Sequence, residues 1–299
     1  MSNYTLDRRT FLASLAAGAV VLPNMAWGAP ARIVSVGGSI TETIYFLKRE
    51  ALLVGADTTS VYPKAAERLP KVGYMRNLSV EGVLSLDPTM ILLEEGAGPP
   101  VAVDSLKSVG VRIEEIAEAR SIDDVVEKIR HIARLVDAAK EGEALANTVA
   151  ERAQTIGKFV DTTKERPRVL FLLDVKDGSL MTAGRNTSVE AIVGLSGGKM
   201  VFDEFEGFRP ITAEAVQHAD PDVILLMSHV TDRLGGDDAV AKLPVLAPLR
   251  AARDGRIIGI NGLLLLGFGP RTPDAVQLLA RKLHGADQIP AAFDPLQPG

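Results

Sequence analysis

The chain has 299 residues, of which 46% are hydrophobic, and it contains no cysteine. This length and this hydrophobic fraction suffice for two lobes of ordinary size with buried cores. The net charge of −5 argues against a nucleic-acid-binding protein, and the absence of cysteine excludes disulfide scaffolds, thiolate zinc sites and a lipid-modified N-terminal cysteine.

The N-terminus has the pattern of a twin-arginine export signal. Arg8 and Arg9 precede a short apolar segment, and small residues follow up to Gly28. The apolar segment is too short to span a bilayer comfortably. We therefore expect residues 1–28 to be a signal peptide that sends a soluble protein to the periplasm. A single N-terminal membrane anchor is the alternative.

Short apolar strands then alternate with helices. We expect strands at 31–36, 52–57, 90–93 and 111–116, and helices at 40–47 and 101–109. The turn Gly37–Ser39 has two glycines, but it lacks the third glycine and the lysine of nucleotide-binding loops. Strands and helices that alternate over short connections predict an open α/β sheet, with ligands bound outside the carboxyl ends of its strands.

The segment between the second and third expected strands is rich in functional side chains. Gly73 permits a sharp turn that would expose Tyr74, and Arg76 follows two residues later. Ser79 has the position of a helix N-cap, with Glu81 in the first turn. A nearby guanidinium favours the phenolate form of a tyrosine, and phenolate is a suitable ligand for haem iron. The alternative is a surface tyrosine beside a solvated arginine.

A nearly unbroken helical pattern extends over 122–164, with an interruption near 140–142. Its second part carries apolar residues on one side and charges on the other. A helix rises ~1.5 Å per residue, so a helix at 141–165 can join two lobes rigidly; an ordinary surface helix is the alternative. Strands and helices then alternate again, beginning with a strand at 169–173 and a helix at 189–195.

An internal repeat supports two lobes of similar plan. Residues 78–93 align without a gap to residues 211–226, and seven of the sixteen pairs are identical, including an Asp-Pro step before an apolar run. We predict an N-terminal α/β lobe at 29–140, the connecting helix at 141–165 and a C-terminal α/β lobe at 166–299. An exported protein of this design is typical of solute-binding proteins with an interlobe cleft.

Two segments resemble a known family. The run from Tyr62–Pro63 through Leu69–Leu86 is similar to the signature of periplasmic haemin-binding proteins that feed ABC-type haem importers, and Leu266–Pro273 is similar to a later part of the same proteins. The resemblance covers most of residues 31–285. It implies the class III periplasmic binding protein fold of the vitamin B12-binding-protein-like family, with two similar α/β lobes, mainly parallel sheets and one long rigid helix.

The resemblance also implies roles for single residues. Tyr74 corresponds to the axial iron ligand, and Arg76 to the basic residue that steadies its phenolate. Glu81 and Glu214 correspond to the two glutamates, one on each lobe, that pair with arginines of the permease. The simpler interpretation is that each glutamate only stabilises the first turn of its helix, by about 0.5 kcal/mol.

The histidines give no zinc-binding spacing. Some relatives use a second haem ligand, a histidine just after the first strand of the C-terminal lobe, but the corresponding segment 173–178 contains none. His229 follows an expected strand at 223–228 and is a candidate substitute for that ligand.

No catalytic arrangement is evident, because neither Ser39 nor Ser79 has a histidine or carboxylate partner at a recognisable spacing. We therefore expect a non-enzymatic protein that captures ferric haem as a transported ligand and delivers it to an ABC permease dimer in the inner membrane. An outer-membrane haem receptor is the expected upstream partner. The alternatives are a ferric siderophore or corrinoid in the same fold, and, more distantly, an exported enzyme.

Overall fold

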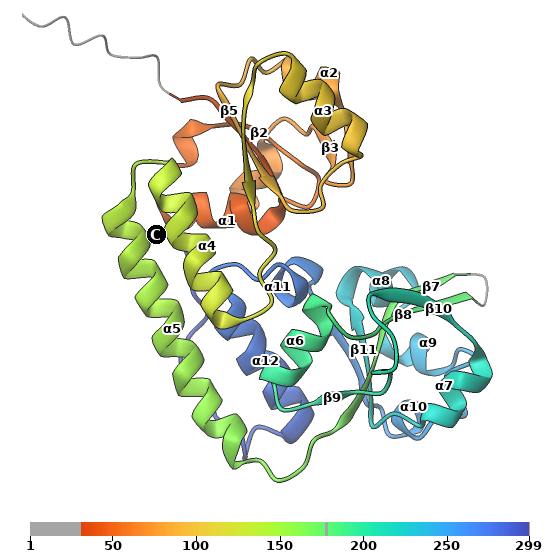
Figure 1. The fold of residues 1–299 in the computed structure, drawn as a ribbon. Coiled ribbons are helices and arrows are strands. Elements are labelled where there is room, and N and C mark those ends of the chain that lie inside the picture. The colour runs from red at the N-terminus through yellow and green to blue at the C-terminus, as the bar shows by residue number, and fades with distance from the viewer. Residues whose placement is uncertain (1–30, 177–178, 299) are drawn as a thin grey trace, which may run out of the picture. The chain divides into compact units, whose positions relative to one another are not determined.

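The computed structural model describes residues 31–176 and 179–298. The predicted signal peptide at 1–28 lies outside these residues. Two open sheets follow one another along the chain, each with helices packed against it, which confirms the predicted α/β class (Figure 1). Within the described ranges, no helix combines the length and the apolar character needed to cross a membrane.

The N-terminal lobe is built on a four-stranded parallel sheet in the order β2-β1-β5-β6. Its strands are β1 (Ile33–Val36), β2 (Leu53–Ala56), β5 (Met90–Glu94) and β6 (Arg112–Ile116). Its helices are α1 (Gly38–Phe46), α2 (Val80–Leu84) and α3 (Pro100–Ser108), with 3-10 turns at Glu50–Leu52 and Lys64–Arg68. Met90 and Leu92 belong to one core and Ile91 and Leu93 to another, because successive strand residues point to opposite faces. Both faces of this sheet are therefore buried.

The C-terminal lobe has a mixed sheet in the order β10-β8-β7-β11-β12, with β9 paired to β7. Its strands are β7 (Arg168–Lys176), β8 (Ser179–Ala183), β9 (Lys199–Met200), β10 (Phe208–Ile211), β11 (Val223–Met227) and β12 (Ile257–Ile260). Its helices are α6 (Ser188–Leu195), α7 (Ala213–Ala219), α8 (Ser228–Arg233), α9 (Asp237–Ala241), α10 (Arg250–Arg253), α11 (Gly262–Leu266) and α12 (Thr272–His284). β7, β11 and β12 are parallel, whereas β8 and β10 form antiparallel pairs. The antiparallel pairs are an addition to the parallel plan expected from the sequence.

Two long helices, α4 (Ile122–Leu135) and α5 (Ala139–Thr162), pack closely against each other, and α5 also contacts α12 of the C-terminal lobe. The expected interruption at 140–142 is wrong by a few residues. The chain turns at Asp137, which has a left-handed backbone with φ of 51°. Gly142 lies inside α5, where an added Cβ would come 2.2 Å from the Cβ of Ala133. This glycine therefore serves close helix packing and does not end a helix.

The internal repeat is visible in the local structure of both lobes. Ser79 and Thr212 are equivalent, and each side chain caps the helix that follows it. Asp87 and Asp220 are also equivalent, and both have positive φ, at 46° and 38°. β5 and β11 then occupy corresponding places, each between two parallel neighbours.

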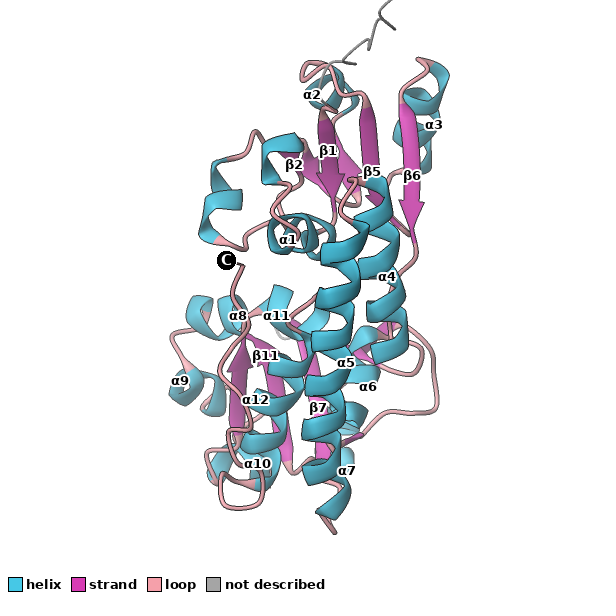
Figure 2. Ribbon diagram, turned by 90° about the vertical axis from the view of Figure 1, so that its left-hand side faces the viewer, coloured by secondary structure: helices cyan, strands magenta, loops and turns pink. Residues whose placement is uncertain are grey.

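The carboxyl ends of the two sheets face each other. β1 and β6 point toward the C-terminal lobe, and β11 points toward the N-terminal lobe (Figure 2). The turn after β1 touches α11, which follows β12: an added Cβ at Gly38 would come 2.6 Å from Cδ1 of Leu263. Loops that follow the strands of both sheets therefore surround one region, as expected for ligand binding in open α/β sheets.

Candidate ligand-binding site

Tyr74 lies on a small hairpin made of β3 (Gly73–Tyr74) and β4 (Asn77–Leu78). Gly73 has φ of 100°, and a Cβ there would come 2.7 Å from the carbonyl oxygen of Asn77. Only glycine fits this position without strain. The tight turn leaves 48% of Tyr74 exposed, which is unusual for a large aromatic residue.

The backbone around Tyr74 is held from both sides. The Thr58 amide donates to the carbonyl oxygen of Gly73 at 2.9 Å, and the Gly98 amide donates to that of Met75 at 2.8 Å. The Leu78 amide donates in turn to the carbonyl oxygen of Gly98 at 2.9 Å. The phenol ring is thus presented to solvent by a fixed backbone, at the carboxyl side of β2 and β5. Such a group is well placed to coordinate a ligand with little reorganisation.

Arg76 occupies the turn of the same hairpin and is exposed, like Tyr74. Within the described residues, no hydrogen bond joins the Arg76 guanidinium to the Tyr74 hydroxyl. Tyr74 lies on β3, and Arg76 follows two residues later in the turn between β3 and β4. The predicted support of the phenolate by Arg76 stays a prediction.

Glu81 and Glu214 have matching surroundings on the two lobes. Glu81 is exposed in the first turn of α2, whose N-cap Ser79 accepts a hydrogen bond from the Gly82 amide at 2.9 Å. Glu214 is exposed in the first turn of α7, after the N-cap Thr212. Hydrogen bonds from its own backbone amide and from the Thr212 hydroxyl lower the pKa of Glu214 below its usual range. Glu214 is therefore a surface anion at neutral pH.

His229 is the second residue of α8, directly after β11, and it is exposed. Arg233 lies one turn further along α8, on the same side of the helix. Its guanidinium pairs with the Asp174 carboxylate near the end of β7. The sequence did not lead us to predict Arg233 and Asp174 as residues of the site. The spacing of four between His229 and Arg233, and the position of Asp174 after an apolar run, are the signals that point to them.

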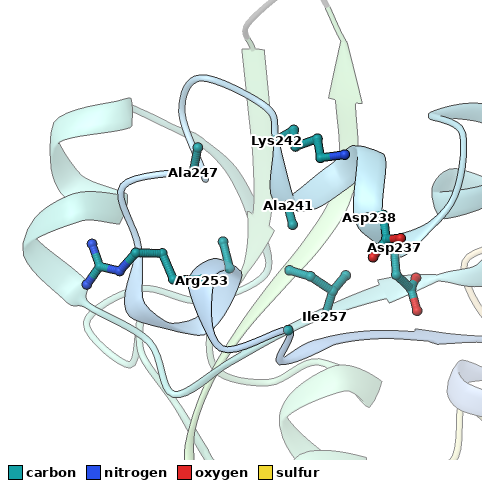
Figure 3. A pocket seen from close by; sticks show the side chains of 9 residues that line it. Asp237, Asp238, Ala241, Lys242, Ala247, Arg253 and Ile257 are labelled. Atoms are coloured by element: carbon teal, nitrogen blue, oxygen red, sulfur yellow. The ribbon is translucent and has the colours of Figure 1, made fainter.

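A cavity of about 320 Å³ opens elsewhere on the C-terminal lobe, between α9, α10 and the start of β12 (Figure 3). Asp237, Asp238, Lys242 and Arg253 give it both signs of charge. None of the residues predicted to bind a ligand lines it. We therefore assign the candidate site to the facing carboxyl ends of the two sheets.

The side chains at this site suit a ligand that brings most of its own coordination. Among the described residues, no group of three or more histidine, cysteine, aspartate and glutamate side chains could hold a bare metal ion. An iron or cobalt centre inside a macrocycle is different, because one axial side chain from the protein suffices. Tyr74 is an exposed side chain able to fill that role.

Comparison with known proteins places these features in context. Residues 33–262 match the family model described as "Periplasmic binding protein". The structure is similar to that of the periplasmic haem-binding protein BhuT in complex with two haems, with 36% sequence identity, a TM-score of 0.81, and coverage of 87% of this chain and 99% of that one.

Two curated relatives are more distant. An uncharacterised ABC transporter substrate-binding lipoprotein, YvrC of Bacillus subtilis, is 27% identical over 85% of this chain and 80% of its own length. A cobalamin-binding protein of Halobacterium salinarum is 28% identical over 85% of this chain and 70% of its own length.

Proposed function

Because the chain belongs to the periplasmic binding protein family, we propose that it captures ferric haem and delivers it to an ABC permease in the inner membrane. The observation that carries this proposal is the exposed Tyr74 on a hairpin anchored from both sides, at the carboxyl edge where ligands bind. The protein reaches the periplasm through its twin-arginine signal and acts there without catalysis.

Tyr74 coordinates the haem iron through its phenolate oxygen. Deprotonation of a phenol at neutral pH needs a compensating charge, which the ferric iron itself and the Arg76 guanidinium supply. Haem also carries two propionates, so a cationic side chain on the opposite lobe suits the ligand. Arg233 lies one turn from His229, the candidate second axial ligand, and a propionate would exchange with or join its present partner, Asp174.

A corrinoid is the second candidate ligand, because the cobalamin-binding relative covers a similar share of the chain. The haem-binding structure has the higher identity, 36% against 28%, and this favours haem. A phenolate also suits ferric iron as a hard oxygen ligand, whereas cobalamin brings its own axial base in many of its forms.

A visible titration distinguishes the two ligands. Ligand-free protein is titrated with haemin and, separately, with cobalamin, and binding is followed by visible absorbance. We expect a charge-transfer band typical of tyrosinate-bound ferric haem and no binding of cobalamin. Tight binding of cobalamin, together with no spectral change on addition of haemin, would show that the ligand is a corrinoid and not haem.

Tyr74→Phe tests the ligand directly. The substitution keeps the ring and removes the oxygen, so we expect an unchanged fold, loss of the charge-transfer band and at least about tenfold weaker haem binding, equal to ~1.4 kcal/mol. The matched control is Tyr45→Phe, which changes a tyrosine that packs against the N-terminal core. Retention of the wild-type spectrum in Tyr74→Phe would show that another residue binds the iron.

Glu81 and Glu214 dock the protein onto the permease. They occupy equivalent positions of a repeated unit, and both are exposed. Two similar anions on two similar lobes suit a permease dimer that offers one cationic partner to each lobe.

A further inference from the structure

The two lobes are also joined away from the long helices and from the contact of Gly38 with Leu263. Arg271, just before α12, donates from Nη2 to the Oε2 atom of Glu42 on α1 at 2.6 Å. Both side chains are nearly buried, with 11% and 3% of their surface exposed. The Arg271 guanidinium also lies 3.4 Å from the centre of the Tyr62 ring. This ion pair and this cation–π contact both cross from one lobe to the other.

The C-terminal tail at 290–298 extends the same contact. The Tyr62 hydroxyl donates to Oε1 of Gln297 at 2.7 Å. The Leu296 amide donates to Oδ2 of Asp274 on α12 at 2.7 Å, and Arg152 on α5 donates to the carbonyl oxygen of Asp294 at 2.8 Å. The tail is thus fixed to the C-terminal lobe and reaches a residue of the N-terminal lobe.

Further hydrogen bonds and one cation–π contact hold the tail against the C-terminal lobe. The side chain of Gln277 on α12 accepts from the Ala292 amide at 2.7 Å and donates to the carbonyl oxygen of Phe293 at 3.0 Å. The Arg152 guanidinium lies 4.7 Å from the centre of the Phe293 ring. The segment has no helix or strand of its own, so these side-chain contacts determine its path.

We propose that Glu42, Tyr62, Arg271 and the tail at 290–298 form an interlobe tie, which fixes the angle between the lobes before any ligand arrives. The long helices limit bending between the lobes, but a twist about the helix axis is resisted only by contacts that lie away from that axis. The pairs described above lie at such a place and cross from one lobe to the other. Tyr62 and Arg271 are then positioning residues, because they set the separation of Tyr74 from the loops of the other lobe.

The tie affects ligand release as well as shape. If haem is the ligand, which rests on the proposed function, a fixed angle keeps both halves of the site in contact with it. A pre-organised site spends less free energy on ordering and releases its ligand more slowly. Weakening the tie should therefore raise the rate of haem dissociation more than it changes the rate of association.

The test measures the separation of the lobes without any ligand. The chain has no cysteine, so Asp104→Cys on α3 and Gln217→Cys on α7 allow two spin labels to be attached at exposed positions, one on each lobe. Interspin distances are recorded by pulsed electron paramagnetic resonance. The tie is weakened by truncation after Pro290 and by Arg271→Lys, which keeps the charge but loses the planar guanidinium. Tyr62→Phe removes only the hydroxyl bonds to the tail.

A control variant removes two ion pairs that do not cross between the lobes. Arg130→Gln on α4 breaks the ion pairs of Arg130 with Glu127 and Glu143 and leaves the interlobe tie intact. We expect one narrow distance distribution in the wild-type protein and in this control. The truncation and Arg271→Lys should broaden it by several ångströms and speed haem dissociation about tenfold, with a smaller effect for Tyr62→Phe.

Unchanged distance distributions in both the truncated protein and Arg271→Lys would overturn the proposal. Thermal melts identify a variant that fails to fold, and the variant that keeps the wild-type melt then decides the question. The truncation removes Phe293, which packs against the C-terminal core, whereas Arg271→Lys and Tyr62→Phe leave that residue in place. A wild-type protein that binds no haem, together with interspin distance distributions that still broaden in the truncated protein and in Arg271→Lys, would support the interlobe tie and contradict the assignment of haem as the ligand. The two proposals therefore fail separately.

Discussion

The exposed phenol of Tyr74 needs a positive partner to act as a phenolate at neutral pH, since a free phenol ionises near pH 10. Arg76 on the same hairpin is the nearest such partner in sequence. We expect Arg76→Ala to remove the positive charge nearest in sequence to the coordinating oxygen and so to move acid-induced haem loss toward neutral pH. The pH midpoint of haem loss, read from the visible spectrum, measures this. Arg68→Ala, at an exposed arginine of the preceding 3-10 turn, is the control. The same midpoint in Arg76→Ala and wild type would contradict the assigned role.

His284 gives the fold a predictable dependence on pH. Burial lowers the pKa of His284 below the ordinary value of 6.5, and its Nε2 lies 3.2 Å from the carbonyl oxygen of Ser196. The unfolded chain therefore takes up a proton at a higher pH than the folded protein does, and stability must fall as the pH drops through about 6.5. Urea unfolding at pH 7.5 and pH 5.5 measures the loss.

The matched variants separate His284 from the rest of the chain. His284→Gln should lose less stability between these two pH values than wild type, whatever its stability at pH 7.5. His218→Gln, at an exposed histidine of α7, should behave as wild type does. If His284→Gln and the wild-type protein lost equal free energy of unfolding between pH 7.5 and pH 5.5, the titration of another group would cause the pH dependence.

At the scale of elements, two glycines of α5 have opposite effects. A Cβ at Gly142 would come 2.2 Å from the Cβ of Ala133, whereas one at Gly157 would meet nothing within 4 Å. We expect Gly142→Ala to destabilise the protein by roughly 1–3 kcal/mol through overpacking. Gly157→Ala should stabilise it by about 0.5–1 kcal/mol, because alanine is the better helix former. Urea denaturation of both variants checks this, and destabilisation of similar size in both would contradict the packing role of Gly142.

The same helices show what the sequence can and cannot reveal about elements. Local signals are reliable where neighbours in sequence decide the outcome, as for Ser79, which is the N-cap expected from its position. Gly142 led to the wrong position for the helix boundary, because a glycine that ends a helix cannot be told by sequence from a glycine that packs against a neighbouring helix. The chain instead turns at Asp137, just after α4, where the backbone is left-handed, a conformation that a non-glycine residue seldom adopts.

Contacts between distant residues account for most of what was missed. The antiparallel pairing of β8 with β7 and β10 depends on packing across the sheet, which no local pattern encodes. The pair of Arg233 with Asp174 joins residues 59 positions apart, and the bond of Tyr62 with Gln297 joins residues 235 apart. Sequence reasoning reached the exposed side chains of the site individually, but not the partners that position them.

At the scale of the whole molecule, the repeated segments 78–93 and 211–226 have matching local structure in the two lobes. The helix caps Ser79 and Thr212 and the positive-φ residues Asp87 and Asp220 correspond at one constant offset in the sequence. Glu81 and Glu214 share that offset, so each follows its cap by the same number of residues. A partner that recognises one lobe by its glutamate can recognise the other in the same way.

The docking role proposed for these glutamates leads to a prediction about transport. An exposed ion pair contributes little alone, about 0–1 kcal/mol, but two contacts on one rigid body reinforce each other through effective concentration. We expect Glu81→Ala with Glu214→Ala to leave haem affinity unchanged and to reduce haem uptake in a reconstituted transporter by more than either single change. A control pair, Glu127→Ala with Glu151→Ala, removes two exposed carboxylates from the long helices and should transport at the wild-type rate. Because transport and binding are measured on the same protein, loss of haem binding in the first double variant would assign the glutamates to the ligand site, and normal transport would remove their docking role.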